Sequence, residues 1–128
     1  MQKNPSYENE GGVVAAVQVY FKERLSTLTS QGIDPDCICF DPGIGFGKTL
    51  EHNLDLLRHL ADLQQDRPIL LGVSRKSLIA AITGEDDPEK RDAGTAAITV
   101  LAYKQGIRLH RVHGVASNIQ ALRVAESL

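Results

Sequence analysis

Apolar residues recur every three or four positions in several stretches of the chain, which is the spacing of one helix face. The pattern predicts helices over 13–30 and 50–63 and a short helical turn over 78–82. A longer helix is predicted to begin at Asp87-Pro88 with a break near Gly94, and a last one is predicted with Ser117 as its cap. The residues of the longer helix expected to pack inward are Ala93, Ala96, Ala97, Val100 and Leu101.

Three short apolar runs alternate with these helices and predict strands over 36–41, 68–73 and 107–112. Helices between short strands are typical of a parallel sheet with crossover connections. Cys37 and Cys39 lie two apart on the first strand, so they share a face. We expect both to be small buried residues, because the sequence lacks partners at zinc-binding spacing.

The chain is short for the fold that this alternation indicates. A complete (β/α)₈ barrel typically takes about 250 residues, and this chain has 128, beginning with a polar stretch over 1–12 that reads as a loop. We therefore predict an α/β fold that is the C-terminal part of a TIM barrel. Residues 1–128 would form one partial domain, with the N-terminal half of the barrel missing.

Composition narrows the classes of partner. The chain is 42% hydrophobic and 23% charged, with a formal net charge of -2, which predicts neither nucleic acid nor an anionic membrane as a partner. No apolar run approaches the roughly 20 residues of a membrane span, and no signal-peptide pattern is present. We expect a cytoplasmic protein.

Polar residues follow each predicted strand. Asp41 ends the first strand, Ser74-Arg75-Lys76 follow the second, and Arg111 and His113 end the third. Parallel strands place these ends on one side, where α/β proteins bind ligands. Arg111 and His113 are two positions apart, so we expect them to point the same way.

The segment around Gly47-Lys48-Thr49 partly matches a phosphate-binding P-loop. The first glycine of that pattern would fall on Pro42, which lacks an N–H group and has a fixed φ. No later apolar strand ends in an aspartate that could hold magnesium. The P-loop interpretation is therefore disfavoured, and Lys48 can equally be a solvated loop cation.

Three motifs in order resemble the last strand-end motifs of the dihydropteroate synthase family. They are Asp41-Pro42-Gly43-Ile44-Gly45-Phe46-Gly47-Lys48, Gly72-Val73-Ser74-Arg75-Lys76-Ser77 and Arg111-Val112-His113-Gly114. The opening Met1-Gln2-Lys3-Asn4-Pro5 is similar to the loop after that family's fifth strand. The resemblance implies condensation of 6-hydroxymethyl-7,8-dihydropterin pyrophosphate with p-aminobenzoate, giving 7,8-dihydropteroate and pyrophosphate in folate biosynthesis. It also implies Mg²⁺, a homodimer or other homo-oligomer, and a sulfonamide target.

The resemblance also implies roles for individual residues. Asp41 would accept hydrogen bonds from the pterin, whose binding would also involve Gly72, Lys76 and Arg111. Arg111 and His113 would hold the pyrophosphate, and with Lys76 they would be the catalytic residues. No residue is assigned to a metal. Gly45 and Gly72 would let the ligand approach the backbone.

Phe46 and Ser77 would line the p-aminobenzoate pocket, although a core aromatic and a helix cap are the alternatives for these two residues. The family's first two strand-end loops have no counterpart in this sequence, so we expect this chain alone to have little or no synthase activity.

Two alternative functions remain open at this point. One is a relative of the methyltetrahydrofolate methyltransferases, against which the Ser-Arg-Lys and Arg-Val-His motifs speak. The other is a non-catalytic half-barrel that associates with itself, because cut strand edges carry unpaired backbone groups.

Overall fold

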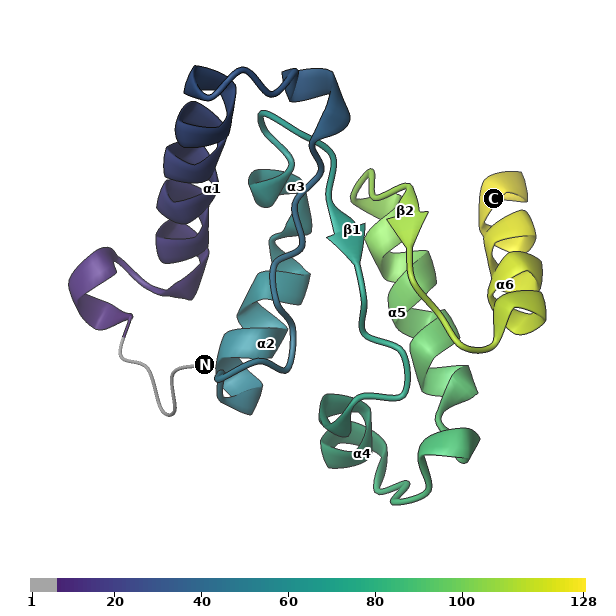
Figure 1. Cartoon of the computed structure of the whole chain (residues 1–128). Helices are drawn as coiled ribbons and strands as arrows, with labels where there is room; N and C mark the ends of the chain where they lie inside the picture. Colours follow the sequence, from purple (N-terminus) through teal and green to yellow (C-terminus); the bar gives the residue numbers. More distant parts are fainter. Residues whose placement is uncertain (1–6) are drawn as a thin grey trace.

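Three extended segments run side by side through the middle of the molecule (Figure 1). The computed structural model describes residues 7–128. Strands β1 (Leu70–Leu71) and β2 (Leu109–His110) pair in parallel, with Leu70 opposite Leu109. Phe40 forms an isolated parallel bridge to Ile69. The spatial order of the three segments therefore follows the chain, as the predicted crossovers require.

The regular strands are much shorter than the predicted ranges 36–41, 68–73 and 107–112. The first range begins in the 3₁₀ helix η2 (Pro35–Cys37), because the Asp34 side chain accepts a hydrogen bond from the Asp36 N–H at 2.9 Å. Single backbone bonds extend the pairing, with Leu70 N donating to Phe40 O at 2.8 Å and Arg111 N to Leu71 O at 2.9 Å. The ligand-side ends of the three segments are thus aligned despite the short strands.

The cysteine prediction is wrong, because Cys37 and Cys39 are both exposed. Cys37 ends the η2 turn, and Cys39 lies on the outermost of the three segments. An outermost segment has a neighbour on one side only, so the apolar pattern of the run does not ensure burial.

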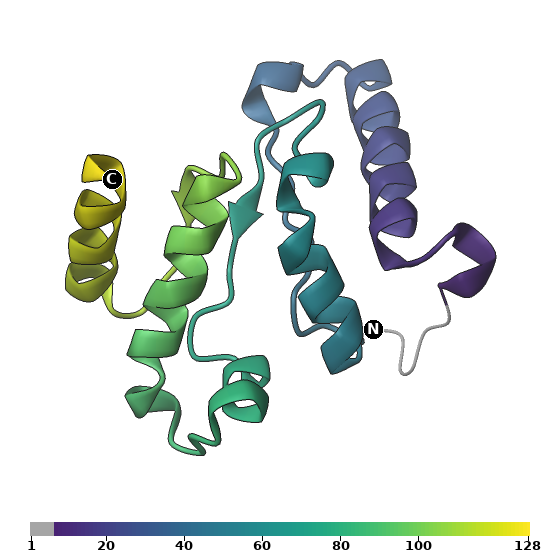
Figure 2. The same cartoon turned by 180° about the vertical axis from the view of Figure 1, so that it is seen from behind.

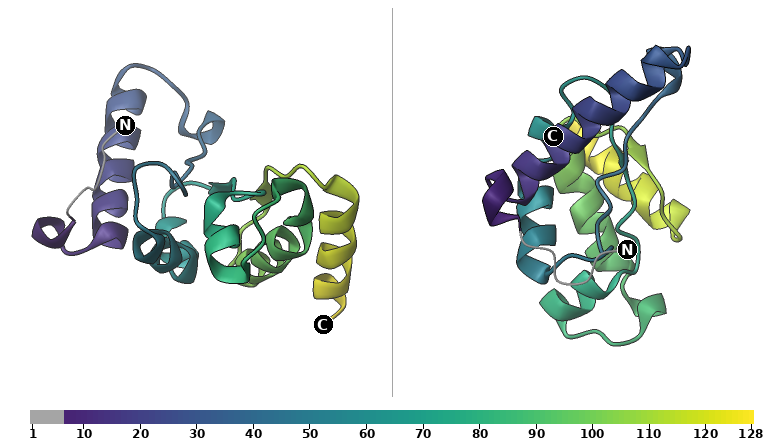
Figure 3. Two further views of the ribbon diagram at one scale, coloured as in Figure 1. Left: turned by 90° about the horizontal axis from the view of Figure 1, so that it is seen from below. Right: turned by 60° about the vertical axis from the view of Figure 1, so that its left-hand side comes forward.

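Helices flank the extended segments. Their bounds are α1 (Val13–Ser30), α2 (Leu50–Arg58), α3 (Leu60–Leu63), α4 (Ser77–Thr83), α5 (Asp92–Lys104) and α6 (Val115–Ser127), with the 3₁₀ helices η1 (Glu8–Glu10) and η3 (Pro88–Lys90). Helices α2, α3 and α5 lie behind the strands in Figure 1 and in front of them in Figure 2. Helices α1 and α6 lie at opposite ends of the molecule, which is clearest in the view from below (Figure 3).

The core lies between the central segment and the helices behind it. Ile69, Leu71 and Val73 are buried, together with Leu56 of α2 and Leu60 of α3. On the α1 side, Phe21 stacks on Phe40 with ring centroids 4.6 Å apart. Burial of these side chains fixes the position of each extended segment along its own direction. It therefore also determines which residues lie at the carboxyl end of the segment.

Several helix predictions need correction. The break in the long helix falls at Arg91, not at Gly94, which lies inside α5. A Cβ on Gly94 would come 2.5 Å from Ile79 Cγ2, so glycine allows α4 and α5 to pack closely. Helix α6 begins at Val115, and Ser117 lies within it and does not cap it.

The inward face of α5 also differs from the prediction. Its buried residues are Thr95, Thr99 and Ala102, whereas Leu101 is 65% exposed. The predicted N-terminal loop contains η1, while the Met1–Pro5 resemblance falls outside the described residues. Within residues 7–128 no helix combines the length and the apolar character needed to cross a bilayer.

Candidate active site

Asp41 and Arg111 join the two outer segments at their carboxyl ends. Arg111 Nη2 lies 3.3 Å from Asp41 Oδ2 across the central strand. The other carboxylate oxygen of Asp41 accepts the Gly43 N–H at 2.8 Å. A carboxylate has about four lone-pair sites, so Asp41 retains acceptor capacity for a ligand.

Gly72 makes room for this pairing. A Cβ on Gly72 would lie 2.2 Å from Arg111 Nη2, so any side chain there would displace the guanidinium. The sequence interpretation gave Gly72 the role of admitting a ligand to the backbone. In the structure the Arg111 side chain lies against the Gly72 backbone at this position. Gly45 has a similar neighbour, because its Cβ would meet Lys76 Cδ at 3.3 Å.

Lys76 reaches from the turn after β1 to the glycine loop, residues 41–49. Its Nζ donates to Ile44 O at 2.5 Å and lies 4.6 Å from the centroid of the Phe46 ring. Burial lowers the pKa of Lys76; Asp41 opposes this shift, whereas the neighbouring cations Arg111 and Lys48 lower the pKa further. A lysine whose pKa is shifted by burial and by neighbouring charges is a common feature of functional sites.

Phe46 and Ser77 both lie next to this lysine, Phe46 through its ring and Ser77 as the following residue of the chain. Phe46 is 54% exposed, which rules out the core-aromatic alternative. Ser77 is the exposed first residue of α4, and Lys76 occupies the cap position without a side-chain cap bond. Both predicted p-aminobenzoate contacts are therefore accessible next to Lys76.

The glycine loop differs from a P-loop. Lys48 Nζ folds back and donates to Gly43 O at 3.0 Å and Phe46 O at 3.3 Å, so it stabilises its own loop. Burial lowers the pKa of Lys48, and Asp41 opposes the shift. Thr49 caps α2 in a reciprocal arrangement with His52. The lysine and the threonine thus have local structural roles.

His113 and Arg111 face one hollow, as their spacing predicted. A cavity of about 260 Å³ is lined by Gly72, Ser74, Lys76, Arg111, Val112 and His113. Asp41 lies on the wall of a second cavity of about 660 Å³, between α1 and the glycine loop. The cavity of about 260 Å³ therefore collects three cationic or protonatable side chains from two different strand ends.

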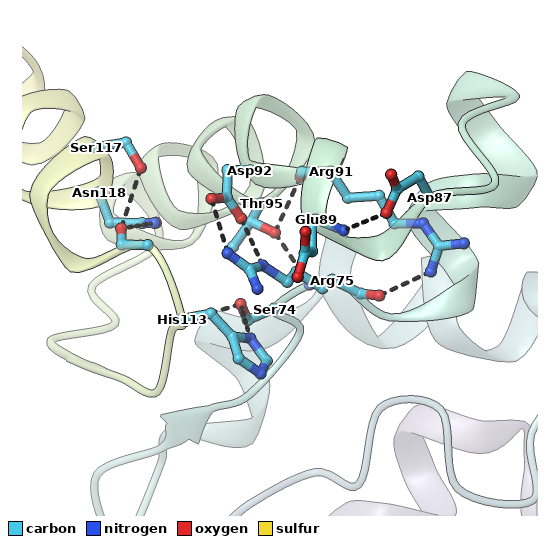
Figure 4. A network of polar contacts seen from close by, with 11 residues as sticks. Ser74, Arg75, Asp87, Glu89, Arg91, Asp92, Thr95, His113, Ser117 and Asn118 are labelled. Carbon is cyan, nitrogen blue, oxygen red and sulfur yellow. Dashed lines mark hydrogen bonds and ion pairs between the residues drawn. The ribbon is translucent and has the colours of Figure 1, made fainter.

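Sequence reasoning missed the residues that hold the turn over 74–77. Arg75, one of the polar residues that follow the second predicted strand, pairs with Asp92 through Nε at 2.9 Å and Nη2 at 3.1 Å (Figure 4). Its backbone N–H donates to Thr95 Oγ1 at 3.1 Å, and Arg91 Nη1 donates to Arg75 O at 2.8 Å. These partners lie 16 to 20 residues away. No local sequence pattern could identify them.

Asn53 was missed for the same reason. It is buried, and its side-chain oxygen accepts the Gly45 N–H at 3.0 Å. The next carbonyl back, Ile44 O, is the one that Lys76 contacts. One peptide unit of the glycine loop is therefore held at both ends.

The described part of the chain has no group of carboxylates that could bind the predicted Mg²⁺. Among residues 7–128, no three His, Cys, Asp or Glu side chains come together as a metal site would require. Asp41 is already paired with a guanidinium, whereas Mg²⁺ prefers several oxygen ligands. These residues do not fit a resident magnesium ion.

Comparison with known proteins identifies the family. A family model described as pterin binding enzyme matches residues 1–113. The chain belongs to this family. Dihydropteroate synthase from Neisseria meningitidis serogroup C is 43% identical over all of this chain and 45% of its own length. The Escherichia coli K12 enzyme is 39% identical, with 99% of this chain and 44% of the relative covered.

Solved structures agree with the sequence relatives. Dihydropteroate synthase from Xanthomonas albilineans in complex with 7,8-dihydropteroate superposes with a TM-score of 0.92 at 40% identity, covering 99% of this chain and 48% of that one. The same enzyme with 4-aminobenzoic acid gives a TM-score of 0.91 at 41% identity, covering 96% and 44%. The fold is thus part of a TIM barrel, and the chain spans less than half the length of these pterin-binding relatives.

Proposed function

We propose that this chain forms part of the active site of a dihydropteroate synthase. The observation that carries the proposal is the position of Arg111. It crosses Gly72, contacts Asp41 and lines the same cavity as Lys76 and His113. That arrangement combines an acceptor for a heterocycle edge with cations for a leaving diphosphate. The ligands of the Xanthomonas albilineans enzyme, the product 7,8-dihydropteroate and the substrate 4-aminobenzoic acid, support the same reaction here.

In the proposed reaction the amine nitrogen of p-aminobenzoate attacks the methylene carbon of the dihydropterin pyrophosphate. A carbon–nitrogen bond forms, the carbon–oxygen bond breaks, and its electron pair leaves with pyrophosphate while the amine loses a proton. Charge accumulates on the departing phosphate oxygens. Arg111 and His113 would stabilise it, because donors aimed at developing charge lower the barrier.

The remaining residues would position the two substrates. Asp41 would accept hydrogen bonds from the pterin amino and ring N–H groups, and Lys76 would contact the carbonyl side. Phe46 and Ser77 would line the p-aminobenzoate side, where a sulfonamide would compete. The relatives' synthase identity favours this reaction over the methyltransferase alternative.

The test is titration of the chain with 6-hydroxymethyl-7,8-dihydropterin pyrophosphate by calorimetry. Replacing Arg111 with Ala removes a charge-assisted contact, so we expect affinity to fall by about tenfold to a hundredfold. Arg123→Ala, an exposed arginine on α6, is the matched control and should bind normally. Absence of binding to the unaltered chain, or equal affinity in Arg111→Ala, would refute the proposal. Pyrophosphate release by this chain alone is expected to stay well below about 1 s⁻¹.

We also propose that the chain self-associates, in line with the homo-oligomer predicted from the sequence. Apolar side chains remain exposed among α2, α4 and α5, including Ile82 at 57% and Leu101 at 65%. They border a hollow of about 470 Å³ with Leu54 and Leu57. Sedimentation at micromolar concentration should give a mass above that of one chain, and Leu101→Glu should reduce it. A strict monomer would contradict this prediction.

A further inference from the structure

The hydroxyl of Ser74 contacts two separate groups of His113. Its Oγ accepts the backbone N–H of His113 at 3.0 Å and lies 2.7 Å from the ring atom Nδ1 (Figure 4). The two residues come from different strand ends, 39 positions apart in the sequence. One hydroxyl therefore fixes both the backbone and the ring of the histidine.

The hydroxyl proton has one destination among these contacts. A serine hydroxyl donates one hydrogen bond and can accept others. Because Oγ already accepts the His113 N–H, its own proton is free to point at Nδ1. We infer that Ser74 is a positioning residue that donates to Nδ1 and keeps the proton of neutral His113 on Nε2.

This tautomer matters for the site, and the inference rests here on the proposed role of His113 in holding pyrophosphate. His113 lines the same cavity as Arg111 and Lys76. With the proton on Nε2, the ring offers an N–H donor to a phosphate oxygen even when it carries no charge. The opposite tautomer would present a lone pair to the anion, which is repulsive.

The turn over 74–77 is built to keep Ser74 in place. Arg75 adopts a left-handed conformation with φ 59°, which is uncommon for a residue with a side chain. Thr95 accepts its N–H, and Arg91 donates to its carbonyl oxygen. The structure thus holds both backbone polar groups of the residue that follows Ser74, and so limits the movement of the Ser74 backbone.

The experiment is nitrogen-15 NMR of the histidine rings in the 128-residue chain at a pH where His113 is neutral. The unaltered chain should show an Nδ1 signal typical of a hydrogen-bond acceptor and a protonated Nε2. Ser74→Ala should shift both signals toward an average of two tautomers, and Ser74→Thr, which keeps the hydroxyl, should restore them. Ser127→Ala, which removes a hydroxyl bonded only within α6, is the control and should change nothing.

A protonated Nδ1 in the unaltered chain would overturn the inference without any variant. Unchanged His113 signals in a folded Ser74→Ala would also overturn it. Titration with inorganic pyrophosphate then tests the function separately. We expect Ser74→Ala to weaken binding by about threefold to tenfold, the effect of one oriented hydrogen bond. If pyrophosphate fails to perturb His113 in a chain with the expected tautomer, the proposed function fails and the positioning role of Ser74 stands.

Discussion

The two loops that meet at Lys76 keep their shapes by different means. The glycine loop, residues 41–49, has positive φ at three glycines and is held by Lys48 from within and by Asn53 and Lys76 from outside. The turn over 74–77 has positive φ at Arg75 and is held by α5 and the segment before it. The first shape depends mostly on its glycines and on partners within eight residues, whereas the second depends on tertiary contact with partners 16 to 20 residues away.

The largest expected effect comes from cutting that tertiary contact. Thr95 is fully buried, and Thr95→Val removes the acceptor of the Arg75 N–H with little change in shape. An unsatisfied buried donor costs about 1–3 kcal/mol, so urea unfolding should show a loss of this size. The His113 ring signals should also change, because Ser74 precedes the released residue.

Thr99→Val is the matched control for this variant. Thr99 is buried one turn further along α5 and donates to Asn118 Oδ1 at 2.7 Å. It should lose comparable stability while the His113 signals and pyrophosphate affinity stay unchanged. Equal effects of both variants on the site would show that the turn responds to general destabilisation and not to its specific anchor.

The glycine loop should respond to a local change with a somewhat smaller effect. Gly45→Ala places a side chain at φ 88°, a conformation that costs an L residue about 1–2 kcal/mol. The new methyl group would also press on Lys76 Cδ. We expect this loss of stability in urea unfolding, together with weaker binding of the dihydropterin pyrophosphate.

Gly84→Ala is the control that separates the loss of stability from the loss of ligand binding. Gly84 has φ 81° with no atom within 4 Å of the added Cβ, so it carries the same backbone cost away from the site. Its stability should fall like that of Gly45→Ala, and its ligand affinity should not. Equal affinities of the two variants would contradict the proposed contact between the glycine loop and Lys76.

This contrast explains what the sequence could and could not predict. Asp41, Arg111 and His113 were predicted to lie near one another because each follows an apolar run in a parallel arrangement, and burial of the runs brings these residues together. Arg75 carries the same local signature, yet it pairs with Asp92. The direction of the Arg75 side chain depends on residues of a later helix, and the local sequence pattern carries no information about that contact.

The same limit accounts for the errors in the fold. Helix α1 was predicted at its observed bounds because its period extends over many turns. The face of α5 was misjudged because alanines and threonines give little contrast, and packing against neighbouring elements decides which of them is buried. Cys37 and Cys39 were misplaced because an apolar run indicates a strand but not how many neighbours the strand has.

The smallest expected effect concerns the ion pair that supports the turn. Arg75 hydrogen-bonds Asp92 and holds the pKa of that carboxyl below its ordinary value. A carboxylate with a depressed pKa in the folded state contributes stability above its unfolded pKa, about 3.9, and loses it as the pH falls through the folded value. Asp92→Asn should therefore be less stable than the unaltered chain at pH 7 and pH 5. The gap should narrow at pH 3 and below.

Urea unfolding at these pH values measures the gap. Glu126→Gln, which alters an exposed carboxylate at the end of α6, is the control. Its difference in unfolding free energy from the unaltered chain should not follow the pH dependence of Asp92→Asn, because Glu126 lies away from Arg75. A constant gap between Asp92→Asn and the unaltered chain down to pH 2 would mean that the ionised carboxylate stabilises the fold no more than the protonated acid does. Asp92 would then support the turn through its hydrogen bonds to Arg75 and not through its charge.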